Sequence, residues 1–520
     1  MRICFYWFNL SAPPGMSVGV SLLAHELALA GHEVSVVLFN EQVGMPLSQE
    51  RIEEHARRSG FGLHALSFGQ NHYTQAMRVA TLLKRAAPES YVLCGGVHTT
   101  LNAEQVLRHP EVDFVGLGEV DHLITRFVAA LEAGDGYDEI PNFWLKRGAE
   151  MVKNPLAPLP DITNQTSLFL EGIDYTPLIR AARGFAETVV GRGCPMRCNY
   201  CHNAAIQATY RRLAGDSGTK RSFCRLRGVD NVIAELSEFV ARYGDEIRAF
   251  NFGDDVFASD PGWLSEFAAR YAAEIKRPFI CNSIAGRLDR DVARLLADAG
   301  CNMVKFGVES GSPRVRREVL NRQLSEPKLR ETVGFLRAQG INTRAYVMLG
   351  MPTETPEERA RTIDLCADLR FDSVRPAIMY PFPGTELHRL CVERDLVDQD
   401  RAPTDYSSTT VLKLPRAERV LLEKTALLYP WLLNRALGGE ARAAARPLIE
   451  RVEGLTAEQW FRGEGREIVV GEGLEIHAAL NRQMVEHYHA PFPERQDAIF
   501  LYRQRPRPLI NISSDGWGEG

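Results

Sequence analysis

The stretch GRGCPMRCNYC, residues 191–201, places three cysteines within eight positions: Cys194, Cys198 and Cys201. Thiolates this close repel one another unless a cation or a metal cluster holds them. A structural zinc site takes four ligands, usually as two separated pairs. The nearest fourth candidate, His202, directly follows Cys201, and adjacent residues rarely bind one tetrahedral ion together. Three ligands leave one coordination position open, which is typical of a metal site that performs chemistry.

Strand and helix patterns alternate around this loop. AETVVGRG (186–193) is a predicted strand that enters it, and further strand–helix units follow up to SVRPAIMYPFPGT (373–385). Six such units predict a partial (β/α)6 barrel over residues 186–395, with its chemistry at the carboxyl ends of the strands.

The spacing C-x3-C-x2-C, with the aromatic Tyr200 before the last cysteine, resembles the radical S-adenosylmethionine (SAM) superfamily. The resemblance implies a 4Fe–4S cluster on the three cysteines, with the amino and carboxylate groups of SAM on the fourth iron. Reduction of that cluster would cleave SAM to a 5′-deoxyadenosyl radical, which takes a hydrogen atom from the substrate. Tyr200 is then expected to cover the cluster or to lie beside the adenine.

Two acidic motifs at predicted strand ends resemble the same family. FNFGDDVF (250–257) carries Asp254 and Asp255, which the resemblance places near the amino group of SAM. The alternative is that they cap the helix that follows. FGVESG (306–311) carries Glu309 and Ser310, and a carboxylate at a strand end can accept hydrogen bonds from ribose hydroxyls or from the ammonium group.

A third motif, TRAYVMLGMPTET (343–355), follows at the next strand. Arg344 is a candidate partner for the SAM carboxylate, or else a solvated charge. Gly350 opens a turn that resembles the family's glycine-containing turn on the adenine side. The cysteine loop followed by these three motifs, in this order, indicates the family more specifically than any one of the four alone.

Residues 1–134 alternate short apolar runs with amphipathic helices, which predicts a Rossmann-like or flavodoxin-like doubly wound parallel sheet. Three stretches resemble the cobalamin-binding branch of the superfamily. LSFGQNHYTQAMRVATLLK (66–84) contains Gly69 and Gln70, VLCGGVHTTLNAEQVL (92–107) contains Gly95, Gly96 and His98, and DFVGLGEVDHLI (113–124) is the last. Glycine allows a bulky ligand close to the backbone.

One departure from that branch concerns the cobalt ligand. Many cobalamin domains carry an Asp-x-His-x-x-Gly loop, which is absent from this sequence. His98, like His72, is therefore expected to be a structural histidine or a cofactor neighbour, and the lower face of cobalt to carry water or another residue. The alternative is that this domain binds no cofactor.

Overall composition limits the remaining possibilities. With 520 residues, 45% hydrophobic, 24% charged and a formal net charge of −5, the chain is expected to have several domains and no nucleic-acid partner. No uninterrupted apolar run is long enough for a membrane span, and the N-terminus lacks a signal sequence, so we expect a cytoplasmic protein. The seven other cysteines are expected to be buried apolar residues.

Two regions show little motif content. Residues 135–185 are proline-rich and are expected to form an interdomain linker. Residues 396–520 contain the helical patterns RAERVLLEKTALLYPWLLNRAL (416–437) and LEIHAALNRQMVEHYH (474–489), and are expected to form a mainly helical region that caps the substrate.

The resemblance implies a cobalamin-dependent radical SAM methyltransferase that methylates an unactivated carbon or phosphorus. Its cofactors would be a 4Fe–4S cluster, SAM and cobalamin, reduced by an external donor of the flavodoxin or ferredoxin type. The substrate would be a small molecule or peptide of natural-product type, with Tyr380 and Glu386 in YPFPGTELHRL (380–390) closing its cavity. A non-methylating cobalamin enzyme, for cyclisation or ring rearrangement, and an iron–sulfur sensor or electron-transfer protein are the alternatives.

Overall fold

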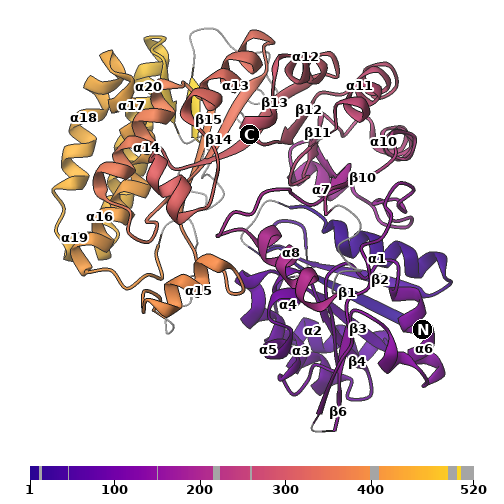
Figure 1. The fold of residues 1–520 in the computed structure, drawn as a ribbon. Coiled ribbons are helices and arrows are strands. Elements are labelled where there is room, and N and C mark those ends of the chain that lie inside the picture. Colours follow the sequence, from indigo (N-terminus) through magenta and orange to yellow (C-terminus); the bar gives the residue numbers. More distant parts are fainter. Residues whose placement is uncertain are drawn as a thin grey trace.

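The protein folds into two largely parallel sheets, each flanked by helices, followed by a group of C-terminal helices (Figure 1). The computed structural model describes residues 1–10, 14–44, 46–148, 150–214, 223–257, 260–398, 409–489 and the backbone of 501–504. The α/β class predicted from the sequence is confirmed: a doubly wound N-terminal sheet, a partial barrel and a helical C-terminal region.

Sheet A, the N-terminal sheet, has the order β2-β1-β3-β4-β5-β6-β7. Its first five strands pair in parallel: β1 (Arg2–Phe8), β2 (Glu33–Phe39), β3 (Leu63–Ser67), β4 (Tyr91–Gly95) and β5 (Phe114–Gly116). An order of 2-1-3-4-5 is that of flavodoxin-like sheets, which bind ligands at the carboxyl ends of their strands.

Helices cover both faces of sheet A. One core contains residues of α1 (Val18–Leu29) and α6 (Ile124–Ala133). The opposite core contains residues of α2 (Gln49–Ser59), α3 (Tyr73–Ala86) and α5 (Ala103–Leu107), and the short α4 (Val97–Leu101) follows β4. In the range assigned to the linker, β6 (Phe143–Arg147) and β7 (Glu150–Lys153) form an antiparallel hairpin that extends sheet A.

Sheet B contains the six parallel strands of the partial barrel. In spatial order they are β8 (Phe185–Thr188), β11 (Ala249–Phe252), β12 (Phe279–Asn282), β13 (Cys301–Glu309), β14 (Asn342–Leu349) and β15 (Ser373–Ile378). The helices α10 (Val229–Tyr243), α11 (Pro261–Arg270), α12 (Arg290–Asp298), α13 (Glu326–Ala338) and α14 (Pro356–Asp368) cover its outside.

Between β8 and α10, the cysteine loop leads through the small ribbon of β9 (Gly191–Arg192) and β10 (Arg225–Leu226). The helix α8 (His202–Leu213) follows the loop and packs on the N-terminal domain (Figure 1). α7 (Thr176–Ala181) precedes β8, and α15 (Glu386–Glu393) follows β15.

The C-terminal helices lie beside α14, at the β15 edge of sheet B (Figure 1). They are α16 (Arg416–Leu427), α17 (Tyr429–Leu437), α18 (Gly439–Glu453), α19 (Ala457–Phe461) and α20 (Glu464–Arg482). Pro430 occupies the first turn of α17, so the pattern expected over 416–437 forms two helices.

The helix expected over 474–489 is wrong at its end. α20 ends at Arg482, and Met484 adopts a left-handed φ of 56°. His487–His489 then form β16, which pairs with β17 (Leu501–Gln504), and β17 adds antiparallel to β15. Pairing with distant residues therefore overrides the local helical pattern. Within the described ranges, no helix has the length and apolar character that crossing a membrane requires.

A buried ion pair joins the linker to the barrel. Arg227 Nη1 lies 2.9 Å from Glu235 Oε1 in α10, and the two side chains are 0% and 3% exposed. The other oxygen of Glu235 accepts a hydrogen bond from the backbone N–H of Leu168 at 2.7 Å. Glu235 thus holds both the linker and the loop before α10.

We predict that Arg227→Met lowers the free energy of unfolding by about 3–5 kcal/mol, because it leaves the Glu235 carboxylate buried without its cation. Arg242→Met, at an exposed position of α10, is the control and is expected to change stability little. Chemical denaturation of both variants measures the difference. Equal stability of the two would contradict a structural role for the pair.

Candidate functional site

The cysteine loop is held by hydrogen bonds from several elements. The Cys194 carbonyl accepts from Gln207 Nε2 in α8 at 2.7 Å, and the Asn199 N–H donates to the Leu320 carbonyl at 3.0 Å. The Arg197 carbonyl accepts from Asn321 Nδ2 at 2.9 Å. The loop is therefore fixed between α8 and the segment after β13.

The three thiols lie in a region that is partly buried and that has an acidic side chain nearby. Cys198 is buried, and Cys194 and Cys201 are half-buried. Burial, together with the nearby Cys198, Asp255 and Cys194, raises the pKa of Cys201 to about 12. Burial also raises the pKa of Cys194. Positive charge beside Cys194 and Cys201, such as that of an iron cluster, would favour their thiolate forms.

The same thiols do not surround a single ion. Throughout the part of the chain that the structure describes, no three His, Cys, Asp or Glu side chains converge closely enough to ligate one metal ion.

Tyr200, Glu309 and a residue that sequence reasoning missed, Arg322, form a buried network beside Cys198. Tyr200 Oη donates to Glu309 Oε1 at 2.8 Å. Arg322 Nη1 lies 3.6 Å from Cys198 Sγ and 3.4 Å from Tyr200 Oη. Glu309 adopts a left-handed φ of 65°, a strained conformation typical of functional sites. Burial raises the pKa of Glu309 although Arg322 opposes the shift.

The two adjacent aspartates have different surroundings. Asp254 is 2% exposed and accepts hydrogen bonds from the backbone N–H groups of Val190 and Gly191, so it fixes the corner that leads into the cysteine loop. Burial raises its pKa to about 7. Asp255 lines a cavity and lies near Cys194 and Cys201, and burial raises its pKa as well.

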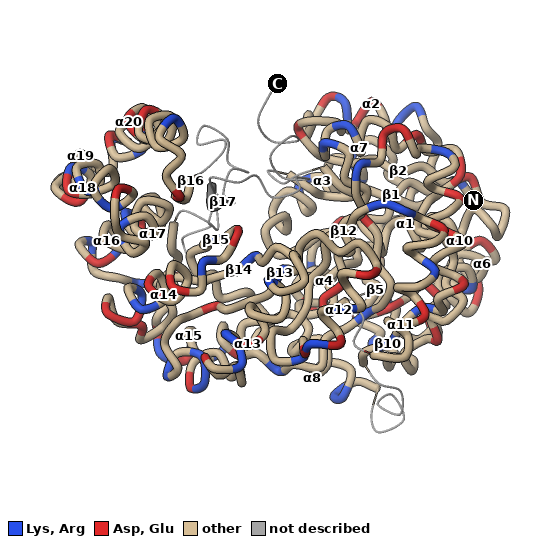
Figure 2. The backbone as a smooth tube through the Cα atoms, turned by 90° about the horizontal axis from the view of Figure 1, so that it is seen from above, with Lys and Arg blue, Asp and Glu red and all other residues tan. Residues whose placement is uncertain are grey.

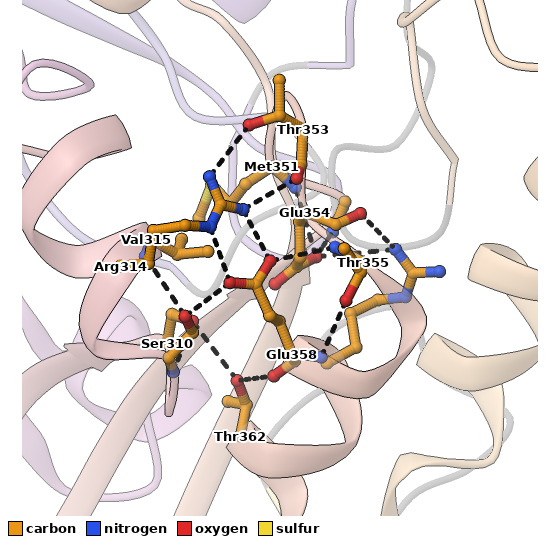
Figure 3. A network of polar contacts seen from close by, with 12 residues as sticks. Ser310, Arg314, Val315, Met351, Thr353, Glu354, Thr355, Glu358 and Thr362 are labelled. Carbon is orange, nitrogen blue, oxygen red and sulfur yellow. Dashed lines mark hydrogen bonds and ion pairs between the residues drawn. The ribbon is translucent and has the colours of Figure 1, made fainter.

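The turns that carry Ser310 and Gly350 are joined by one polar network (Figure 3). Arg314 donates to the Thr353 carbonyl at 2.8 Å and to Glu358 Oε1 at 2.9 Å. Ser310 Oγ lies 3.5 Å from Thr362 Oγ1 and accepts from the Ser312 N–H, so the serine faces this network. Gly350, with a φ of 74°, donates its N–H to Glu354 at 2.7 Å. The network fixes both turns relative to α14.

Arg344 lies away from the cysteine loop. It is five residues before the end of β14, opposite Lys305 in the register, and Nε donates to Ser373 Oγ at 3.0 Å. Tyr380 follows β15, and its ring packs against Phe382, which contacts His202 beside Cys201. Glu386 begins α15, where its 46% exposed side chain pairs with Arg389.

A cavity of about 490 Å³ lies between the two domains. Its wall on sheet A includes five strand-end glycines among apolar side chains such as Trp7 and Leu93, and its wall on the barrel includes Gly193, Asp254 and Asp255. A Cβ on Gly96, whose φ is 94°, would clash with the Phe68 backbone. A floor of backbone suits a large flat ligand such as a corrin ring. The glycines are Gly69, Gly95, Gly96, Gly116 and Gly118.

His98 and Gln70 lie beneath this floor. His98 is 2% exposed and packs against Tyr73 with ring centroids 4.7 Å apart, and burial lowers its pKa to about 4. Gln70 opens the short turn before α3. Among the described residues, His98 Nε2 and Gln70 Oε1 are buried without a hydrogen-bond partner.

A cluster of ion pairs connects the two walls of the cavity. We call Arg192, Arg225, Glu119 and Asp121 the interdomain clamp. Arg192 Nη2 lies 2.9 Å from Asp121 Oδ2, and both arginines pair with Glu119. All four side chains are less than a fifth exposed. The acids come from the loop after β5 and the arginines from β9 and β10, so the clamp fixes sheet A against the cysteine loop.

Comparisons with known proteins agree with this geometry. Residues 188–366 match the radical SAM superfamily and residues 11–128 match the B12 binding domain. An uncharacterized methyltransferase from Pyrococcus horikoshii is 28% identical over 62% of this chain and 67% of its own. The cytidylyl-2-hydroxyethylphosphonate methyltransferase of Streptomyces wedmorensis is 24% identical over 66% and 69%. The anaerobic magnesium-protoporphyrin IX monomethyl ester cyclase of Synechocystis is 23% identical over 88% of both chains.

Solved structures share the fold. OxsB, a cobalamin-dependent S-adenosylmethionine radical enzyme solved with aqua-cobalamin, superposes with a TM-score of 0.67 at 13% identity over 96% of this chain and 83% of its own. TsrM from Kitasatospora setae, a radical S-adenosylmethionine methyltransferase solved with cobalamin and a [4Fe-4S] cluster, gives 0.61 at 16% identity over 76% and 75%.

The fold and the site define a radical SAM enzyme. This chain belongs to the cobalamin-binding branch of the radical S-adenosylmethionine enzymes, as its sequence predicted. Its cofactors are accordingly a 4Fe–4S cluster, SAM and cobalamin.

We predict that Cys194→Ala, Cys198→Ala and Cys201→Ala each abolish the iron–sulfur absorbance of the anaerobically reconstituted protein, because each removes one of three ligands. Cys224→Ala is the control, since Cys224 lies near Cys194 but outside the loop. Iron and sulfide analysis and electron paramagnetic resonance measure cluster content. A cluster that survives loss of Cys198, or is lost with Cys224, would contradict this ligand set.

We predict that Arg192→Met lowers the free energy of unfolding by roughly 2–4 kcal/mol, since Glu119 and Asp121 lose a cation in a mostly buried place. Arg211→Met, at an exposed position of α8, is the matched control. Chemical denaturation of both variants, with the cluster and cobalamin bound, measures the free energy of unfolding. If the two variants unfold alike, the clamp does not hold the domains.

Proposed function

We propose that this protein is a cobalamin-dependent radical SAM methyltransferase that methylates an unactivated carbon or phosphorus. The observation that carries the proposal is the shared cavity, whose walls are the glycine floor of sheet A and the Asp255 side of the cysteine loop. A methyl donor on one wall and a radical source on the other need this arrangement, because the substrate has to meet both. The two methyltransferase relatives support the choice of reaction.

The chain's own residues would bind the cofactors, orient them toward the substrate and shield them from water. Cys194, Cys198 and Cys201 would hold the cluster, and the strand-end glycines would support cobalamin. When bound, these groups and SAM supply the hydrogen-abstracting radical and the methyl group. Asp255, near Cys194 and Cys201, and Glu309, beside Tyr200, would offer carboxyl oxygens suited to the ammonium and ribose hydroxyls of SAM. The protein's task is to place these species and exclude water.

Several supporting roles belong to the same proposal. Tyr200 and Arg322 would orient Glu309, since both contact it or its partners. Gly350 and the turn that follows would lie on the adenine side, held by Glu354. Tyr380 would face the substrate, with Glu386 at the outer edge of the same segment.

The cellular compartment, the class of substrate and the electron donor belong to the same proposal. The ten cysteines, all within the described residues, form no disulfide, which suits a reducing compartment such as the cytoplasm. Residues of both charge signs alternate along the outer helices (Figure 2), which suits a small-molecule substrate better than a nucleic acid. An external one-electron donor of the flavodoxin or ferredoxin type would reduce the enzyme.

Incubation of the reconstituted holoenzyme with SAM and dithionite tests the reaction. We expect 5′-deoxyadenosine together with S-adenosylhomocysteine, and no 5′-deoxyadenosine from Cys198→Ala. 5′-Deoxyadenosine without S-adenosylhomocysteine would favour the cyclase-like alternative, which the long match to the Synechocystis enzyme supports. If neither product forms although the cluster is intact, the proposal is wrong.

A further inference from the structure

The inner face of the barrel carries charged and polar residues. Along β13, β14 and β15, alternate side chains belong to the core beneath the outer helices, for example Phe306, Val347 and Val374. The residues between them face the other way, because successive side chains of a strand point to opposite sides. These inward positions are Lys305, Arg344, Tyr346 and Arg375, which we call the cationic wall. Figure 2 shows basic positions on these strands in the interior of the molecule.

The strand register brings the wall together. Lys305 is opposite Arg344, and Tyr346 is opposite Arg375 on the neighbouring strand. The Arg375 guanidinium lies 6.0 Å from the centre of the Tyr346 ring. Lys305 Nζ donates to Asn251 Oδ1 on β11 at 2.7 Å. Three strands therefore contribute cations to one area.

Two residues of the wall keep part of their surface exposed. Tyr346 and Arg375 are half-buried, whereas the core-facing residues Val347 and Val374 are fully buried. Gly307, level with Tyr346, contributes no side chain, and the next inward positions are Met348 and the small Ala377. Tyr346 is opposite Gly307 and, after a register irregularity, Val347 is opposite Glu309, so the wall begins just below the level of Glu309.

The electrostatic potential at the wall is positive. Burial would raise the pKa of the Tyr346 phenol, but Lys305, Arg344 and Arg375 together lower it. Burial lowers the pKa of Lys305. The carboxyl group that faces Lys305 from β8 is Glu187, and burial raises its pKa. Cations held in such a place gain most from an incoming anion.

We propose that the cationic wall binds an anionic group of the substrate: a carboxylate, phosphate or phosphonate. The substrate is then an acidic small molecule, with its anionic end deep in the barrel and its reacting carbon near the level of Glu309. This assignment gives Arg344 to the substrate and leaves the SAM carboxylate to groups nearer the cysteines. It rests on the proposed function, whose substrate class it names.

Calorimetry on the cobalamin- and cluster-loaded enzyme tests the proposal, with methylphosphonate and succinate as probes and tetramethylammonium as the cationic comparison. We expect both anions to bind, and to bind at least about tenfold more weakly in Lys305→Met and Arg375→Met, because a charge-assisted contact is lost. Lys328→Met, an exposed lysine on α13, is the matched control and should bind like the wild type.

A second measurement, on the wild type and Tyr346→Phe, tests the proposal even if the lysine and arginine variants fold poorly. Bound anion should raise the pKa of the Tyr346 phenol, seen as a higher pH for the appearance of its phenolate absorption in a titration of the wild type, a shift absent from Tyr346→Phe. Anion binding unchanged in Lys305→Met and Arg375→Met, or tetramethylammonium binding as tightly as the anions, would overturn the inference. So would weaker SAM binding with unchanged anion binding in these variants. Failure to form 5′-deoxyadenosine would instead remove the proposed function.

Discussion

The interdomain clamp is the constraint on which the site depends. Arg192 and Arg225 belong to the ribbon beside the cysteine loop, whereas Glu119 and Asp121 belong to the sheet that offers the glycine floor. Because these charges are mostly buried, separating the domains would expose uncompensated ions at considerable cost. The clamp thereby fixes the width of the cavity, and with it the distance across which two cofactors act on one substrate.

Local sequence predicted the parts of the site that depend on spacing along the chain. The cysteine loop, the acidic strand ends and the strand-end glycines are short motifs, each at the end of a strand that periodicity reveals. The five parallel strands of sheet A and six of sheet B follow from the same periodicity. The assignment to the cobalamin-binding branch came from these motifs and was confirmed by both domain matches.

Features that depend on contacts between distant segments could not be predicted from local sequence. Arg322 and Cys198 are far apart in sequence, and only the turn after β13 brings them within 3.6 Å. The depth of Arg344 in the barrel depends on strand register, which no local pattern encodes. His487–His489 look helical, yet pairing with β17 makes them a strand. The clamp joins residues from two domains and leaves no motif.

One helix belongs to both halves of the molecule. α8 begins directly after Cys201, and its Tyr210 lies in the hydrophobic core of sheet A and accepts a hydrogen bond from the Glu119 N–H at 2.8 Å. A ligand that steadies one end of α8 reduces the ordering cost at the other. If occupancy of the iron–sulfur site changes the affinity of the corrinoid site through α8, reciprocity requires the same factor in the other direction.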